Sequence, residues 1–166
     1  IENCFECSSI NKCSKCKDGF FFIGDDREHC FNQIKNIENY YTNDNETSFK
    51  LCNSSIDYCS KCENEFLCKE CYNNYFLVKN YNTTKCLDEK EIEEEKEKYY
   101  TEDNGITYFS CNSSIKNCDK CINKEHCTKC EDNYFFLDEN IEECYKDKEN
   151  EINVEEYYTL DNVLYL

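Results

Sequence analysis

Residues 111–130 read CNSSIKNCDKCINKEHCTKC, and this arrangement of cysteines recurs along the chain. Together with Cys144 it forms the pattern C-x6-C-x2-C-x5-C-x2-C-x13-C. Residues 52–86 carry the same pattern with one more residue in the last gap, and residues 4–30 carry it without the first cysteine. These three sets account for all 17 cysteines, so the sequence predicts tandem cysteine-rich units.

Segments between the cysteines repeat as well. LCNSSI at residues 51–56 matches SCNSSI at residues 110–115, and a Tyr-Tyr-Thr triplet begins at residues 40, 99 and 157. We therefore expect the chain to be a segment of a longer array. Its expected divisions are a truncated first repeat (1–39), a second repeat with an acidic linker (40–98), a third repeat (99–156) and the start of a further repeat (157–166).

The composition excludes several classes of protein. Cysteine makes up 17 of 166 residues, a density typical of a disulfide scaffold. The 36 acidic residues outnumber the 19 basic ones, which disfavours binding to nucleic acid because phosphate groups need a basic surface. No apolar run approaches the ~20 residues that span a membrane. The sequence predicts a small disulfide-rich fold of short β-hairpins and loops, with the tandem cysteine-rich repeats forming an elongated chain.

Within each unit we expect two short hairpins. One covers residues 99–110, with Asp103-Asn104-Gly105 as turn residues that tolerate positive φ. The other covers residues 134–144 and turns at residues 138–140. Between the hairpins, the closely spaced cysteines suggest a knot of loops without regular structure. The acidic run at residues 88–98 is expected to be a solvated linker, with one short helix as the alternative.

The cysteines favour disulfides over metal or redox chemistry. The gap of five residues between the two C-x2-C pairs is shorter than is usual in paired zinc knuckles. His29 and His126 lie at different places in the repeat, so neither is part of its design. Tetrathiolate zinc and a redox-active C-x2-C pair remain open as alternatives. We expect disulfides, no catalytic residue, no metal and no cofactor.

The motifs that follow the cysteines carry a family resemblance. KDGFFF (17–22), YNNYFL (72–77) and EDNYFFL (131–137) each come directly after C-x2-C-x5-C-x2-C. In this the chain resembles the furin-like, or growth-factor-receptor, cysteine-rich repeat. Arrays of such repeats occur in surface proteins of single-celled eukaryotes, including Giardia variant surface proteins and the Entamoeba intermediate lectin subunit. There is a weaker resemblance to scaffoldin repeats of anaerobic fungi. The resemblance does not extend to the Tyr-Tyr-Thr segment.

The resemblance implies a disulfide pairing, whereas the spacing alone leaves fifteen connectivities open for six cysteines. In the family the first cysteine of a unit pairs with the third, the second with the fourth and the fifth with the sixth. In the first unit this leaves Cys7 unpaired or bonded to another chain. The implied pairs are Cys4 with Cys13, Cys16 with Cys30, Cys52 with Cys62, Cys59 with Cys68, Cys71 with Cys86, Cys111 with Cys121, Cys118 with Cys127, and Cys130 with Cys144.

Two further kinds of site follow from the residues. Four N-x-[ST] sequons predict glycosylation at Asn45, Asn53, Asn82 and Asn112, with a turn-forming role as the alternative. Side chains alternate along a strand, so one tyrosine of each Tyr-Tyr pair is expected to face outward and contact a partner. The candidates for this contact are Tyr40, Tyr41, Tyr99, Tyr100, Tyr157 and Tyr158.

These observations predict a non-enzymatic structural or surface repeat protein that presents N-glycans outside the cell or at its surface. The expected partners are neighbouring copies or repeats of itself, with carbohydrate or another surface protein as further candidates. The alternative is a binding module, either a lectin-type adhesin or a scaffoldin-like module that docks other proteins. We expect no binding to nucleic acid, and no membrane-spanning stretch in this segment.

Overall fold

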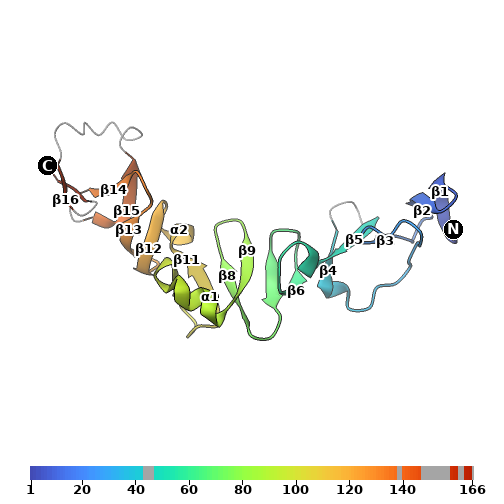
Figure 1. Cartoon of the computed structure of the whole chain (residues 1–166), viewed down its shortest axis with the longest axis horizontal. Helices are drawn as coiled ribbons and strands as arrows, with labels where there is room; N and C mark the ends of the chain where they lie inside the picture. The colour runs from blue at the N-terminus through green and yellow to red at the C-terminus, as the bar shows by residue number, and fades with distance from the viewer. Residues whose placement is uncertain (43–46, 138–139, 147–157, 161–162, 166) are drawn as a thin grey trace. The chain divides into compact units, whose positions relative to one another are not determined.

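A computed structural model describes residues 1–42, 47–137, 140–146, 158–160 and 163–165. Short strands joined by loops, turns and a few short helices make up these residues (Figure 1). The chain divides into two compact units, Ile1–Asn73 and Asn74–Leu166. This confirms the predicted small disulfide-rich fold made of short β-hairpins. Among the described residues, no helix is long and apolar enough to cross a membrane.

The paired C-x2-C segments form hairpins and not the knot of loops that the spacing suggested. Cysteines three residues apart would face opposite sides of a regular strand. The hairpins of the second and third repeats contain register shifts, for example between Cys59 and Cys62. These shifts bend the strand, so that both cysteines of the C-x2-C pair are buried. The hairpins are β1 (Cys4–Ser9) with β2 (Lys12–Cys16), β6 (Cys59–Cys62) with β7 (Cys68–Cys71), and β12 (Cys118–Asn123) with β13 (His126–Cys130).

A second hairpin follows the cysteine hairpin in the second and third repeats, as predicted, whereas the first repeat has only an isolated antiparallel bridge between Phe21 and Phe31 at this place. The residue that starts this segment has positive φ in every repeat, 81° at Gly19, 72° at Asn74 and 68° at Asn133, which explains the Gly or Asn at this position. The predicted turn residues 138–139 lie outside the described residues. The strands are β8 (Tyr75–Lys79) with β9 (Thr84–Asp88), β14 (Tyr134–Leu137) with β15 (Asn140–Lys146), and in the first repeat the short β3 (Phe22–Ile23).

The Tyr-Tyr-Thr segments begin the third kind of hairpin, also as predicted. At its turn the Asp103 carboxylate accepts hydrogen bonds from the backbone N–H groups of Ile106 (3.1 Å) and Thr107 (2.8 Å). Asn104 and Gly105 adopt positive φ. The strands are β4 (Tyr40–Tyr41) with β5 (Ser48–Leu51), β10 (Tyr99–Thr101) with β11 (Thr107–Ser110), and β16 (Tyr158–Leu160) with β17 (Val163–Tyr165).

Parallel strand pairs join each repeat to the next. Strand β3 pairs with β5, β8 with β11, and β14 with β17. The resulting sheets have the orders β3-β5-β4, β9-β8-β11-β10 and β15-β14-β17-β16. Each sheet therefore contains strands from two consecutive sequence repeats. The boundary between the compact units consequently lies at residues 73–74, inside the repeat 40–98, and not where the sequence repeats begin.

The acidic run before the third repeat forms a helix, which was the alternative to a solvated linker. Helix α1 (Glu89–Glu94) starts with a capping box: the Asp88 carboxylate accepts from the Glu91 N–H, and the Glu91 carboxylate accepts from the Asp88 N–H. The 3₁₀ turn η3 (Lys96–Lys98) follows. Ile92 is 6% exposed and packs with Val78 and Tyr99, so this single apolar residue anchors the run.

Disulfides and aromatic rings make up the core. No polar or charged residue is buried among the described residues. The short helix α2 (Cys111–Ser114) and the matching 3₁₀ turn η2 (Cys52–Ser54) each contribute one buried cysteine. The largest core cluster contains Tyr100, Cys111, Ile115, Cys118, Cys121, Cys127, Cys130, Phe136 and Cys144.

Candidate functional site

Sixteen of the 17 cysteines are disulfide-bonded. Cys71 and Cys86 are both among them. The Cα atoms of the other bonded pairs lie 5.5–5.9 Å apart. These are pairs that the family resemblance implies: Cys4 with Cys13, Cys16 with Cys30, Cys52 with Cys62, Cys59 with Cys68, Cys111 with Cys121, Cys118 with Cys127, and Cys130 with Cys144.

Consecutive disulfides lie against each other. The sulfur atoms of Cys13 and Cys30 are 3.7 Å apart, and those of Cys127 and Cys144 are also 3.7 Å apart. Sulfur triplets of this kind would be close enough to share a metal ion as thiolates. Because each of these sulfurs is bonded to another, none is a thiolate in this form of the chain. The arrangement therefore serves as covalent core packing.

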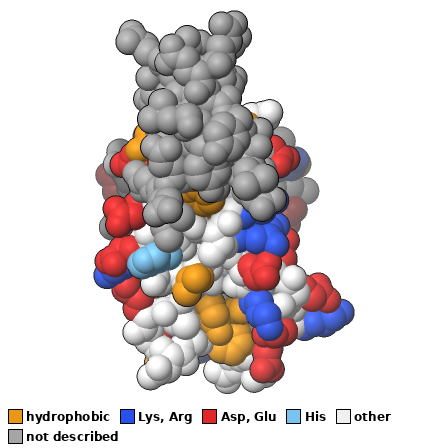
Figure 2. Space-filling model, turned by 90° about the vertical axis from the view of Figure 1, so that its left-hand side faces the viewer, with side chains coloured by type: hydrophobic (Ala, Val, Ile, Leu, Met, Phe, Trp, Pro, Cys, Tyr) orange, Lys and Arg blue, Asp and Glu red, His pale blue; other side chains and the backbone are white. Residues whose placement is uncertain are grey.

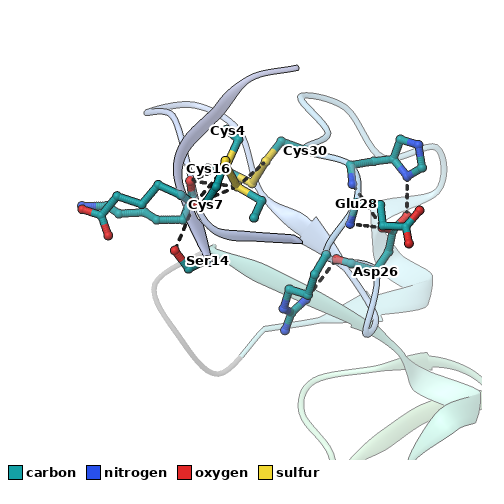
Figure 3. The surroundings of a disulfide bond; sticks show 12 residues. Cys4, Cys7, Ser14, Cys16, Asp26, Glu28 and Cys30 are labelled. Carbon is teal, nitrogen blue, oxygen red and sulfur yellow. Dashed lines mark hydrogen bonds and ion pairs between the residues drawn. A yellow bond between two sulfur atoms is a disulfide. The ribbon is translucent and has the colours of Figure 1, made fainter. Parts of the chain in front are cut away.

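Cys7 is the one free cysteine among the described residues, and it is exposed. Figure 3 shows it beside the Cys4 disulfide, and its sulfur lies 3.4 Å from that of Cys4. The residues at its position in the other two repeats are Cys62 and Cys121, which bond to Cys52 and Cys111. Cys7 thus occupies a position that is disulfide-bonded in the other repeats.

Asn53 and Asn112 hold turns in place, which is the role that the sequence left open beside glycosylation. Their side-chain carbonyl oxygens accept hydrogen bonds from the backbone N–H groups of Tyr58 (2.7 Å) and Asn117 (2.9 Å). Tyr58 and Asn117 both have positive φ. Asn53, Asn112 and the third sequon residue Asn82 are exposed, whereas Asn45 lies outside the described residues.

The expectation that one tyrosine of each Tyr-Tyr pair faces outward is wrong for Tyr99 and Tyr100. Tyr99 and Tyr100 are 9% and 8% exposed, Tyr41 is buried and Tyr40 is half-buried. The side chains of Tyr99 and Tyr100 do alternate, but both faces of β10 are covered. Tyr100 packs on the cysteine cluster and Tyr99 packs on Val78 and Ile92. Tyr157 and the side chain of Tyr158 lie outside the described residues.

Figure 2 shows acidic, basic and uncharged side chains interspersed on one face of the molecule. One ion pair occurs at the same position in two repeats, Glu38 with Lys61 and Glu97 with Lys120. The hydrogen bond from Lys120 is the main cause that lowers the pKa of the Glu97 carboxyl group. Each pair connects the turn before β4 or β10 to the cysteine hairpin of the same repeat.

The Asn74–Leu166 unit contains a hollow of about 770 Å³ beside α2. Sequence reasoning singled out only Asn112 among its lining residues. Ser110, Ser113 and Ser114 belong to the repeated SCNSSI segment, whereas Asn80 and Tyr81 come from the turn after β8 and no local pattern connects them to it. The lining residues are Asn80, Tyr81, Ser110, Asn112, Ser113, Ser114, Lys116 and Asn117.

Comparison with known proteins adds no assignment to these features. No protein-family model and no curated protein matches the chain. The resemblance to furin-like repeats therefore stays a prediction, and the function is argued from the geometry.

Proposed function

We propose that this chain is a non-enzymatic structural repeat protein of the cell surface or extracellular space, a segment of a longer array that presents N-glycans. The observation that carries the proposal is the parallel strand pair between consecutive repeats. Its register is Phe22 opposite Ser48, Leu77 opposite Thr107, and Phe136 opposite Val163. Because the same strand pair connects each repeat to the next, a further repeat can be added to the array without a new kind of interface.

Burial at the join supports this role. Val78 from one repeat is fully buried and packs with Tyr99 from the next. Neither hairpin has this cover on its own, so part of each repeat's apolar burial depends on its neighbour. In solenoid and array proteins, the stability of each repeat likewise depends on its contacts with the neighbouring repeats.

Covalent bonds supply the remaining order. Each observed bridge closes a loop of 9–14 residues, worth roughly 3 kcal/mol in the chain-entropy model. Such bridges persist in an oxidising compartment, which favours secretion or surface display. A net charge of −17 keeps the surface hydrated and favours solubility. The cysteines thus have a structural role in the proposal, and no catalytic role is assigned to them.

Labelling of intact and permeabilised source cells with an antibody against the chain tests this proposal. We expect equal labelling before and after permeabilisation, and regular strings of density when the labelled material is imaged. An antibody against a cytosolic protein is the control for membrane integrity. Labelling only after permeabilisation, or free thiols at the paired cysteines in native material, would contradict the proposal.

A further inference from the structure

The hollow beside α2 lies between that helix and the turn that joins β8 to β9. It has a volume of about 770 Å³, within the usual range for small-ligand sites. Asn80 and Tyr81 line it from the turn, and Asn112 lines it from α2. All of these residues belong to the Asn74–Leu166 unit. A sequon asparagine therefore forms part of the wall of a hollow large enough for sugar rings.

Several polar groups in this hollow have no partner within the part of the chain that the structure describes. Among the described residues, the side chains of Asn80, Tyr81, Lys116 and Asn117 make no hydrogen bond or ion pair. The Tyr81 side chain is 82% exposed, the most exposed tyrosine that the structure describes. An uncovered aromatic ring beside unpaired amides matches the chemistry of a sugar, which offers apolar C–H faces and a rim of hydroxyl groups.

The Asn112 side chain is held at this wall. Its carbonyl oxygen accepts from the Asn117 N–H, and its amide nitrogen donates to a Glu131 carboxylate oxygen at 2.7 Å. The amide nitrogen has two hydrogens and uses one of them for Glu131. The other is available for replacement by a glycosidic bond, so both hydrogen bonds can persist after glycosylation.

We propose that the hollow is the seat of the first sugars of an N-glycan attached to Asn112. The first sugar lies against the Tyr81 ring, while the Asn80 amide and the Lys116 ammonium group donate to its oxygens. The inference rests on the N-glycan part of the proposed function. It adds that the glycan at this site is packed on the protein and not simply displayed.

The preceding repeat supplies an internal comparison. Asn53 occupies the position of Asn112 and has the same bond to a backbone N–H. When the repeats are aligned by the cysteines before the turn, Cys16 and Cys71, however, Asp25 and Asp26 stand in place of Asn80 and Tyr81. Asp57 likewise stands for Lys116. Tyr58, which is 46% exposed, stands at the position of Asn117, but no ring stands at the position of Tyr81 in the turn. A glycan on Asn53 therefore lacks the Tyr81 contact and is expected to be held less firmly.

The test uses the full chain made in a host that forms disulfides and N-glycans. Peptide mass spectrometry first measures occupancy at Asn53 and Asn112. The native protein is then digested with an endoglycosidase that cuts within the core of the glycan. We expect trimming at Asn112 to be about tenfold slower than at Asn53, because sugar–aromatic contact stabilises the packed state. The two rates should become equal after reduction and alkylation.

Tyr81→Ser should raise the trimming rate at Asn112 to that at Asn53. The matched control is Tyr72→Ser, which removes an exposed tyrosine outside the hollow and should leave both rates unchanged. Equal rates in the native protein, or no effect of Tyr81→Ser, would overturn the seat while leaving glycan presentation intact. An unoccupied Asn112 in material whose other sequons are occupied would overturn the seat, and no occupied sequon at all would also remove the glycan-presenting function.

Discussion

The Tyr41 hydroxyl lies 2.6 Å from the Ser55 hydroxyl, and Tyr100 makes the same hydrogen bond to Ser114 one repeat later. Each bond connects the first strand of a Tyr hairpin to the end of η2 or α2, which holds the first cysteine of the same repeat. Ser55 and Ser114 are also the third residues of the sequons at Asn53 and Asn112. In each repeat, the tyrosine–serine hydrogen bond therefore connects the Tyr hairpin to the sequon.

Removing the Tyr100 ring should destabilise the chain much more than removing its hydroxyl. Tyr100→Phe loses one hydrogen bond and should lower the free energy of unfolding by about 1 kcal/mol. Tyr100→Ala leaves a cavity against the cysteine cluster and should lower it by about 3 kcal/mol or more. Denaturant unfolding under non-reducing conditions measures both. Tyr81→Ala, at an exposed ring, is the control and should change little. Similar losses for Tyr100→Phe and Tyr100→Ala would show that the ring is not a core group.

Replacing Ile92, the buried residue of α1, should remove the packing of this helix against β8 and β10. Ile92→Ala removes buried methyl groups from the cluster with Val78 and Tyr99, so we expect a loss of about 2–3 kcal/mol in thermal or denaturant unfolding. Ile106→Ala changes an isoleucine that is 72% exposed and should be near neutral. If the two variants behave alike, residues 89–94 are a solvated linker in solution.

A charge at the join between repeats should have a local effect. Val78→Asp places an unpaired carboxylate where the side chain is fully buried. We expect faster amide hydrogen exchange in β8 and β11, with unchanged exchange in β1 and β2, because repeat proteins depend on nearest neighbours. Lys79→Asp, at an exposed position on the same strand, is the control. Uniform loss of protection over the whole chain would mean that the repeats fold as a single unit.

Lowering the pH should weaken the Glu97–Lys120 ion pair. The hydrogen bond with Lys120 lowers the Glu97 pKa, and the same bond raises the Lys120 pKa. The stabilising contribution of Glu97 is therefore present above its unfolded pKa and is lost as the pH falls through its folded pKa. Carboxyl NMR titration should show the pKa of Glu97 below the ordinary glutamate value, returning toward it in Lys120→Gln. An unchanged pKa in that variant would exclude the pair in solution.

Peptide mapping without reduction checks the covalent framework. We expect the observed pairs together with a peptide linking Cys71 to Cys86, and alkylation of Cys7 alone in the native chain. Mapping after full reduction is the control for peptide recovery. Zinc bound by free thiolates, or a different partner for Cys71, would reject the pairing that the family resemblance implies.

The sequence by itself determined the features that depend on local spacing and local turns. The repeated cysteine gaps defined the units, and the Asn, Asp and Gly residues between β-forming stretches located the hairpins around Asn74 and Asp103. These signals lie within a few residues of the structure that they specify. The family pattern added an order of pairing that matches each pair described above, which spacing alone could not select.

Tertiary structure decided what covers each face. Alternation placed Tyr99 and Tyr100 on opposite sides of a strand, but only the fold brings Ile92 to one side and the disulfides to the other. The parallel pairing of β8 with β11 joins residues about thirty positions apart, and no local pattern encodes it. The hollow at Asn112 likewise exists only because the turn at Tyr81 folds back beside α2. Burial depends on which distant segments contact each other. The alternation of side chains along one strand does not contain that information.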